Sequence, residues 1–343
     1  MSEPTVSSRY MRQTIFPGIG LEGQCKLLAA NVVIIGCGAT GTVLANHLAR
    51  AGVGRLTIVD RDFIELNNLQ RQLLFDEQDL ADHLPKAVAA ERKLRAINSE
   101  IEVQGVVADA NPDNIEKLIE GATLVMDGTD NFETRYILND ACVKHNIPWI
   151  YTGAVSSYGM SQTIIPGETA CLRCLSPDIP PPGTAATCDT AGVVGPIVAA
   201  VASISAAEAI KLIVGQGDLN RGIIHFDVWY NSFEQFGSAG PRFDCPACQQ
   251  RNFEFLNQEI GAQTVSLCGR NAIQIRQPGS HIPLAELAER VGEVSHITAR
   301  NDFLLRFTVD DYELTVFADA RAIIKGTQDE SIARGLYAKY VGT

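Results

Sequence analysis

The stretch VVIIGCGATG, residues 32–41, decides the fold expected for this chain of 343 residues. Its first four residues form an apolar β-branched run typical of a buried strand, and the glycines after it predict a tight turn. From Thr40 to Ala51 the apolar residues recur with the period of a helix. Leu56–Asp60 is a second apolar run, and it ends in an acid. This strand–turn–helix–strand order predicts the opening of a parallel sheet.

The turn has the composition of a phosphate-binding loop. Its glycines, Gly36, Gly38 and Gly41, would let the backbone approach a phosphate or ribose at a helix N-terminus, where free N–H groups favour negative charge. Asp60 lies nineteen residues after Gly41 and is positioned to accept hydrogen bonds from ribose hydroxyls. This pairing is typical of a site for an adenosine-containing ligand, and it does not separate NAD from ATP. A tight turn without a ligand is the alternative.

Strands and helices continue to alternate beyond this unit. The pattern predicts strands at Ile101–Val107, Thr123–Asp127 and Trp149–Tyr151, and helices at Lys86–Ile97, Pro112–Ile119 and Phe132–His145. The pattern then changes, because Tyr158–Ile165 is typical of an antiparallel strand. The proline-rich stretch Pro177–Gly183 cannot continue a helix and predicts a surface loop. A helix at Pro196–Val214 and strands near Ile223–Trp229 are expected to follow.

A domain boundary is expected near Asn257–Ala262 and divides the chain into residues 1–257 and a C-terminal module, residues 262–343. The module is expected to have a β-α-β-β-α order, with elements at Ala272–Arg276, Leu284–Val291, Phe303–Val309, Glu313–Phe317 and Ser331–Tyr340. The predicted fold class is therefore α/β. A Rossmann-like, mostly parallel sheet continues into antiparallel strands, is stapled by zinc, and is followed by a small α+β module.

The composition excludes several classes of protein. A hydrophobic content of 46% supports a large core, and a net charge of −12 argues against a general nucleic-acid binder. Nine cysteines, an odd number, with no secretory signal favour a reducing compartment, and cytoplasmic is the expected location. The longest uncharged apolar run, Ala191–Ala207, is marginal for a membrane span. It indicates a buried helix, so no membrane association is expected.

Four cysteines form two CxxC pairs, Cys171/Cys174 and Cys245/Cys248. Two thiolates from each pair supply four soft ligands, which is the donor set of a closed tetrahedral zinc site. Seventy residues separate the pairs (245 − 174 − 1), so the metal would join distant parts of the chain. The sequence therefore predicts one structural Zn²⁺ per chain.

Several charged residues surround the glycine loop in sequence or in the predicted sheet. Three of these are cations of the kind that neutralise the phosphates of a nucleoside triphosphate: Arg71, Lys86 and Arg12. The alternative is that each of them is an ordinary charged residue on the solvated surface. Asp130 follows a predicted strand at the edge where ligands bind and is a candidate for Mg²⁺. Its alternative role is the N-cap of the next helix. Asp127 is a weaker candidate for the same metal.

An ordered set of motifs resembles the ThiF/MoeB-type adenylyltransferases, bacterial relatives of ubiquitin-activating enzymes. The resemblance covers about residues 9–250. The motifs, in chain order, are Arg9-x-x-Arg12-Gln13, the glycine loop, Asn68-Leu69-Gln70-Arg71-Gln72, Pro85-Lys86, Thr129-Asp130-Asn131, Cys171-x-x-Cys174, Thr190-Ala191-Gly192-Val193 and Cys245-x-x-Cys248. The ordered set is far more specific than any one motif. Two positions depart from the family, because Ala39-Thr40-Gly41 ends the loop where relatives often have Gly-Leu-Gly, and Gly128 stands where many have cysteine.

The resemblance implies a reaction and roles for the site residues. ATP and the C-terminal Gly-Gly carboxylate of a small ubiquitin-like sulfur carrier would give an acyl-adenylate and pyrophosphate, for thiamine or molybdopterin synthesis. Asp130 would bind Mg²⁺ and orient the ATP, and Asp60 would hold the ribose. The phosphates would be held by Asn68, Arg71 and Lys86. The resemblance also implies a homodimer, in which Arg12 reaches the triphosphate of the partner.

Two alternatives stay open at the level of sequence. The glycine loop and Asp60 alone also suit an NAD-dependent oxidoreductase, although Arg71 and Lys86 favour a triphosphate and no His or Tyr is placed as a hydride-transfer acid. A carrier-binding protein without catalysis is a third class. Cys188 lies where ThiF-like members have a cysteine that can link covalently to the carrier, and a loop thiol without chemistry is its alternative.

Overall fold

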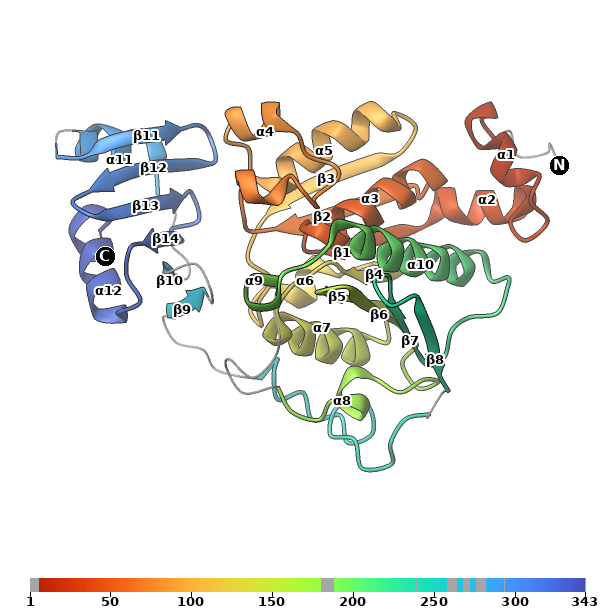
Figure 1. Ribbon diagram of the computed structural model, residues 1–343. Coiled ribbons are helices and arrows are strands. Elements are labelled where there is room, and N and C mark those ends of the chain that lie inside the picture. The colour runs from red at the N-terminus through yellow and green to blue at the C-terminus, as the bar shows by residue number, and fades with distance from the viewer. Residues whose placement is uncertain are drawn as a thin grey trace. The chain divides into compact units, whose positions relative to one another are not determined.

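The computed structural model describes residues 6–179, 188–237, 240–257, 264–267, 272–275, 282–292 and 294–342. The chain forms two compact units, Met1–Gln258 and Glu259–Thr343 (Figure 1). Each unit has its own sheet and its own hydrophobic core.

The first unit is built on an eight-stranded sheet with the order β3-β2-β1-β4-β5-β6-β7-β8. Its strands are β1 (Asn31–Ile35), β2 (Arg55–Asp60), β3 (Glu102–Val107), β4 (Leu124–Asp127), β5 (Trp149–Val155), β6 (Tyr158–Ile164), β7 (Ile223–Asp227) and β8 (Ser232–Phe236). The first five strands are parallel, and β6, β7 and β8 continue the sheet in antiparallel pairs. The predicted change from a parallel to an antiparallel sheet is confirmed.

Helices cover both faces of the parallel strands (Figure 1). The central strand β1 shows the consequence, because Val32 and Ile34 pack into one core while Val33 and Ile35 pack into the other. A parallel strand with both faces buried is therefore almost wholly apolar. The first core contains α2 (Gly20–Ala29), α3 (Ala39–Ala51), α5 (Lys86–Ile97) and α10 (Gly195–Val214), and the second contains α6 (Ile115–Leu118) and α7 (Phe132–His145).

Short helices of three to five residues precede these elements or lie between them. They are η1 (Ser8–Tyr10), α1 (Met11–Thr14), η2 (Leu66–Asn68), α4 (Glu77–Ala81), α8 (Leu172–Leu175) and α9 (Cys188–Ala191). The N-terminal α1 and α2 and the edge strand β8 are not among the predicted elements. α2 contains Gly20 and Gly23, which weaken a helical signal, and β8 is exposed along most of its length. The predicted loop Pro177–Gly183 is described only as far as Ile179.

Helix α10 is the one helix in the described ranges that is long and apolar enough to cross a membrane. It packs against α2, α3, β5, β6 and β7, so the predicted burial holds for the face of the helix that contacts these elements. Only 50% of its most apolar window is buried within the chain, although the mean hydropathy of that window is 2.0. The helix therefore has an apolar face that the first unit does not cover.

The second unit is a six-stranded antiparallel sheet with the order β11-β12-β13-β14-β10-β9. Its elements are β9 (Thr264–Leu267), β10 (Ala272–Ile275), α11 (Leu284–Gly292), β11 (His296–Arg300), β12 (Leu304–Val309), β13 (Tyr312–Phe317), β14 (Ala322–Lys325) and α12 (Glu330–Tyr340). Both helices share one core with the sheet, through residues such as Leu287, Leu314 and Tyr337. The expected β-α-β-β-α order is wrong in its strand number, because β9, β11 and β14 are additional strands whose conformation comes from pairing with their neighbours.

Candidate nucleotide site and cysteine cluster

The carboxyl ends of the parallel strands bring the predicted site residues to one edge of the sheet. Gly36 follows β1, Asp60 ends β2, and Gly128 follows β4. The strand order reverses at β1, since β2 and β3 lie to one side of it and β4 and β5 to the other. In open α/β sheets, ligands bind at such a point outside the carboxyl ends of the strands.

Close packing requires some of the glycines at this edge of the sheet but not all of them. A Cβ on Gly41 would lie 2.0 Å from the carbonyl oxygen of Gly36, and one on Gly128 would lie 2.3 Å from the same atom. Gly36 also has a φ of +92°, in the region that favours glycine. Gly38 differs, because the nearest atoms to a Cβ there are 4.0 Å away. Packing therefore requires glycine at positions 36, 41 and 128, whereas a Cβ on Gly38, the N-cap of α3, would make only ordinary van der Waals contacts.

Asp60 ties the glycine loop to the end of β2. One of its carboxylate oxygens accepts a hydrogen bond from the Cys37 N–H at 2.6 Å, and the other accepts from the Asp62 N–H at 2.7 Å. Burial raises the pKa of Asp60, and the charge of Lys86 opposes that rise. The structure thus brings Asp60 to the loop as the sequence predicts, and hydrogen bonding to a ribose stays a prediction.

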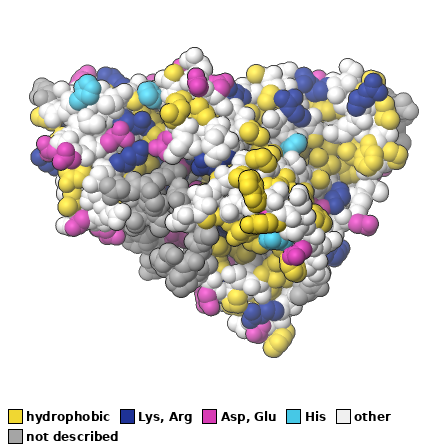
Figure 2. All heavy atoms as spheres, viewed as in Figure 1, with side chains coloured by type: hydrophobic (Ala, Val, Ile, Leu, Met, Phe, Trp, Pro, Cys, Tyr) yellow, Lys and Arg dark blue, Asp and Glu magenta, His cyan; other side chains and the backbone are white. Residues whose placement is uncertain are grey.

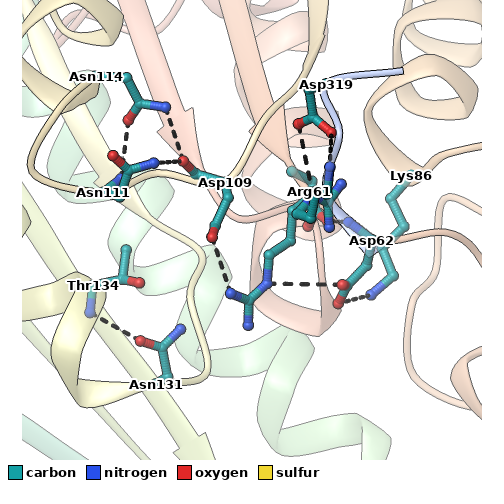
Figure 3. Close-up of polar contacts among 11 residues, drawn as sticks. Arg61, Asp62, Lys86, Asp109, Asn111, Asn114, Asn131, Thr134 and Asp319 are labelled. Carbon is teal, nitrogen blue, oxygen red and sulfur yellow. Dashed lines mark hydrogen bonds and ion pairs between the residues drawn. The ribbon is translucent and has the colours of Figure 1, made fainter. Parts of the chain in front are cut away.

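Lys86 reaches the same turn from the start of α5. Its side chain is buried, and its Nζ lies 3.4 Å from the Asp62 Oδ2, while its backbone N–H donates to the Asp62 carbonyl at 2.9 Å. Figure 3 shows the Lys86 and Asp62 side chains pointing toward each other. Lys86 is thus a buried cation paired with a carboxylate, and its role at a phosphate group stays a prediction.

Asn68 and Arg71 lie on the segment that follows β2. Asn68 is buried, and its Oδ1 accepts a hydrogen bond from the Glu65 N–H at 3.1 Å, so it also caps η2. Arg71 is half-buried and its Nη1 donates to the Asn67 carbonyl at 2.8 Å. Gln72 is also buried, and its Nε2 would lie 4.0 Å from a Cβ on Gly38. Gln72 is a site residue that the sequence argument leaves out, although it stands in a quoted motif.

Asp127, which ends β4, and Asp130, which follows it, have different environments. Asp127 is fully buried, and its Oδ2 lies 2.9 Å from the Arg135 Nε, while its Oδ1 accepts from the Thr129 N–H at 2.9 Å. Asp130 is exposed. The alternative that Asp130 caps α7 is wrong, because the Asn131 side chain accepts from the Thr134 N–H at 2.9 Å and is the N-cap (Figure 3). Asp127 is unsuited to a metal, and Asp130 is left as the accessible carboxylate.

Arg61 and Asp109 are further residues at this edge that the sequence argument misses. The Arg61 Nη1 lies 3.0 Å from the Asp109 Oδ1, and its Nε lies 3.9 Å from the Asp62 Oδ1 (Figure 3). Burial lowers the pKa of Arg61, but the carboxylates of Asp109, Asp62 and Asp130 outweigh it and raise that pKa above its usual range. The position of Arg61 directly after Asp60 is the only signal that the sequence carries for it.

Cys188 opens α9 at the same edge of the sheet. Its Sγ is half-buried and lies 3.6 Å from the carbonyl oxygen of Ala154, near the carboxyl end of β5. The segment after it is fixed to the β5–β6 turn by hydrogen bonds from the Ser156 N–H to the Gly192 carbonyl and from the Val194 N–H to the Ser156 carbonyl. β5 is two strands from β1, which corresponds to about 10 Å across the sheet.

Arg12 lies on α1 and is exposed. Its neighbour Gln13 donates from Nε2 to the Ala51 carbonyl at 2.9 Å, so α1 is held at the C-terminal end of α3. The glycine loop is at the other end of α3, and a helix of 13 residues spans about 20 Å. The structure therefore does not bring Arg12 to the other predicted site residues of its own chain.

The four cysteines of the CxxC pairs lie close together in space. Their sulfur atoms all fall within 4.8 Å of one another. Neighbouring Sγ atoms are 3.7 Å apart for Cys171–Cys174, 3.6 Å for Cys171–Cys245 and 3.5 Å for Cys174–Cys248. Zn–S bonds of about 2.3 Å in a tetrahedron give an S···S distance of about 3.8 Å. The cluster thus has the donors and nearly the spacing that a zinc ion requires.

Comparison with known proteins gives consistent results. A model of the ThiF family matches residues 10–247. The chain is 43% identical over 339 residues to the sulfur carrier protein ThiS adenylyltransferase of Bacillus subtilis, covering 98% of this chain and 100% of that one. It is 37% identical over 248 residues to the sulfur carrier protein adenylyltransferase of Thermus thermophilus, covering 70% of this chain and 90% of the relative. The crystal structure of E. coli MccB with ATP superposes with a TM-score of 0.61 at 26% identity, over 71% of this chain and 75% of that chain.

Proposed function

The chain belongs to the ThiF family and is an adenylyltransferase, and from this premise we propose that it activates the C-terminal Gly-Gly carboxylate of a small ubiquitin-like sulfur carrier. ATP is the second substrate, and the products are the carrier acyl-adenylate and pyrophosphate. The carrier serves thiamine or molybdopterin biosynthesis, and we place the reaction in residues 1–257 and in the cytoplasm. The similarity to a ThiS adenylyltransferase along nearly the whole chain carries the proposal.

ATP is proposed to lie across the carboxyl edge of the sheet. Its phosphates lie at the N-terminus of α3, where Gly38 leaves the backbone open to a ligand. The ribose lies against Asp60, and Asn68, Arg71 and Lys86 hold the phosphates. The buried position of Lys86 beside Asp62 supports this arrangement, because a desolvated cation interacts strongly with an anion. The carrier carboxylate then attacks the α-phosphorus, and pyrophosphate leaves.

Asp130 is proposed to hold Mg²⁺. Its carboxylate is exposed at the edge, whereas Asp127 is occupied by Arg135 and capping of α7 is performed by Asn131. Mg²⁺ prefers oxygen ligands and keeps several waters, so one accessible carboxylate together with substrate phosphates suits it. When bound, it would neutralise charge on the phosphate oxygens.

We propose that the enzyme is a homodimer, formed through the apolar face of α10 and the N-terminal helices. Figure 2 shows hydrophobic side chains gathered over α10 and over the α1–α2 segment. Met11, Ile15, Phe16 and Leu21 are each at least half exposed. A contiguous exposed apolar patch of this kind marks an interaction site.

A twofold axis explains how Arg12 could act in such a dimer. A twofold axis perpendicular to α3 pairs the two copies of this face in antiparallel fashion. The C-terminal end of α3, which carries α1, then faces the partner's glycine loop. Arg12 is held about the length of α3 away from its own loop, so a role at a triphosphate requires the partner.

Cys188 is proposed to accept the activated carrier after adenylation. Its sulfur lies at the same edge as the glycine loop, two strands along the sheet. Its thiolate would attack the acyl carbon of the acyl-adenylate, a thioester would form, and AMP would leave with its electron pair. The four clustered cysteines are proposed to bind Zn²⁺, which would supply folding free energy rather than chemistry.

Carrier-dependent exchange of labelled pyrophosphate into ATP tests the proposed function. We expect exchange with a ThiS-like carrier and Mg²⁺, and none with the same carrier lacking its last two glycines. NAD binding measured beside it tests the oxidoreductase alternative. NAD binding without any exchange, in zinc-loaded and dimeric protein offered carriers of both pathways, would overturn the proposal.

A further inference from the structure

The ends of β2 and β3 form the part of the edge that lies beyond the glycine loop and Asp60. Phosphates at β1 and a ribose at the end of β2 direct the base of the nucleotide toward the next strand outward, which is β3. Asp60 pairs with Val107 in the parallel register, and the Ala108 N–H donates to the Asp60 carbonyl. The residues that follow both strands are therefore the neighbours expected for the base.

The residues at this position are an arginine and a short polar loop. Arg61 follows β2, and its side chain is 24% exposed. Half-buried Ala108 and Ala110 flank Asp109 on the opposite strand end and offer small apolar surfaces. A flat base could lie between such small side chains and the plane of a guanidinium.

The orientation of Arg61 is fixed from both sides. Its Nη1 lies 3.0 Å from the Asp109 Oδ1, and its Nε lies 3.9 Å from the Asp62 Oδ1. The backbone of Asp109 is fixed in turn, because the Asn114 Nδ2 donates to its carbonyl at 2.9 Å and the Asn111 Nδ2 donates to the same oxygen. Figure 3 shows both amides pointing at Asp109 and the Asp109 carboxylate pointing at the guanidinium.

The charge balance argues against a phosphate at this position. Asp109 and Asp62 both face Arg61, and Asp62 also faces Lys86, so the charge of the Arg61 guanidinium is already balanced by carboxylates. A neutral aromatic base is compatible with this balance, because a guanidinium stacks on aromatic rings through its plane while its edge stays bound to carboxylates.

We propose that the guanidinium of Arg61 forms one face of the site for the adenine base of ATP, with Asp109 as the positioning residue that holds it there. The proposal rests on the proposed function, since it requires ATP as the substrate. The alternative is that Arg61 and Asp109 only tie the ends of β2 and β3 together, without contact to a nucleotide.

Calorimetric binding of Mg·ATP and of Mg·tripolyphosphate to the full-length enzyme separates these roles, because tripolyphosphate has no base. We expect Arg61→Ala and Arg61→Lys to weaken ATP binding roughly tenfold and to leave tripolyphosphate binding within about twofold of the wild type. Arg61→Tyr replaces the planar guanidinium by an uncharged aromatic ring, which can also stack on a base, so it should retain most of the ATP affinity. Arg55→Ala is the matched control, because Arg55 makes a similar ion pair with Glu102, 2.9 Å apart, at the other ends of β2 and β3.

Asp109 has its own test. Asp109→Ala should weaken ATP binding in the same direction as Arg61→Ala but less, and the double variant should bind no more weakly than Arg61→Ala alone. Equal losses for ATP and tripolyphosphate, or full rescue by Arg61→Lys, would overturn the stacking role. If Arg61→Ala does not fold, the ATP affinities of Arg61→Lys and Arg61→Tyr still distinguish stacking on the base from a purely structural role. If the wild-type enzyme shows no ATP binding or no pyrophosphate exchange, that result would instead count against the proposed function.

Discussion

The nucleotide edge of the sheet and the cysteine cluster both join residues that are distant in sequence, but they present their polar groups in opposite ways. At the edge, Gly38 is half-buried without close packing neighbours and Asp130 is exposed. In the cluster, Cys171 and Cys245 are almost fully buried, and the sulfur atoms face one another. One region is open to a ligand from solution, and the other is closed around its own donors.

Substitutions at the edge should therefore affect chemistry, and substitutions in the cluster should affect folding. An exposed carboxylate is solvated in the free enzyme, so replacing it removes little folding free energy. Buried sulfur ligands have no comparable solvation, so losing one leaves a defective metal site inside the core. The edge also contains both kinds of residue within a few positions, which gives the comparison an internal control.

Substitutions of Asp130 and Asp127 should have the largest effects, the first on activity and the second on stability. Asp130→Asn should lower carrier-dependent pyrophosphate exchange by about a thousandfold at unchanged melting temperature, because phosphate charge is left uncompensated. Asp127→Ala should destabilise the protein by about 3–5 kcal/mol, because it leaves Arg135 buried without its ion pair. Denaturant unfolding and exchange assays measure the two effects. Near wild-type exchange in Asp130→Asn would show that Asp130 holds no essential metal.

Cys245→Ser should have the reverse profile. We expect loss of bound zinc and a drop in stability of several kcal/mol, because the metal contributes folding free energy directly. Cys25→Ser is the control, since Cys25 is a half-buried thiol outside the cluster. Metal analysis and thermal melts of both variants check this. Wild-type protein purified without chelator that contains no zinc would refute the closed metal site.

Substitution of Arg12 tests whether one chain supplies every residue of the nucleotide site. Arg12→Ala should lower exchange by roughly a hundredfold at unchanged stability. Mixing it with inactive Asp130→Ala and allowing subunits to exchange should restore about a quarter of wild-type activity, because half of the dimers then carry one intact site of two. Recovery is measured after native mass spectrometry has shown that heterodimers form. Heterodimers without recovered activity would mean that Arg12 does not act across the interface.

Asp140 lies between the two regions and should give a pH signature. It sits on α7, and its Oδ2 accepts from the Phe255 N–H at 3.1 Å, just beyond the second CxxC pair. Burial raises the pKa of Asp140 to about 6. The folded state therefore holds the proton more tightly than the unfolded state, and the contribution of this group to stability falls as the pH rises from about 4 through about 6.

Asp140→Asn keeps an acceptor for the Phe255 N–H and cannot ionise. It should match the wild type near pH 4 and exceed its unfolding free energy by about 1–3 kcal/mol at pH 7.5. Denaturant titrations at the two pH values measure the difference. A constant gap between the two proteins across this range would show that Asp140 does not titrate as its burial suggests.

Cys188→Ser is expected to change adenylation least. Exchange should stay within about twofold of the wild type, because the thiol acts only after the adenylate has formed. A thiol-sensitive adduct between enzyme and carrier should disappear in mass spectra recorded under non-reducing conditions. If the adduct persists in Cys188→Ser, another cysteine forms it. If wild-type enzyme forms no adduct, the reaction ends at the adenylate.

The sequence predicted those parts of the fold and site that depend on local spacing. The glycine loop, the acid at the end of the next strand and the two CxxC pairs are each contained in short segments whose chemistry is legible from the residue types. For the same reason, the spacing of apolar residues along the chain correctly predicts β1, α3 and β2. The short strands β11 and β14 of the second unit were missed, because their conformation comes from pairing with neighbouring strands.

Residue types and their spacing are therefore enough to predict the fold class, the family resemblance, the loop with Asp60, and the four candidate zinc ligands. The folded chain is needed to show that Asn131 rather than Asp130 caps α7, that Asp127 pairs with Arg135, and that Arg12 lies far from its own loop. It also brought Arg61 to Asp109. The physical reason is that a capping bond, an ion pair or a distance across a helix depends on how separate segments pack, and residue spacing along the chain does not specify that packing.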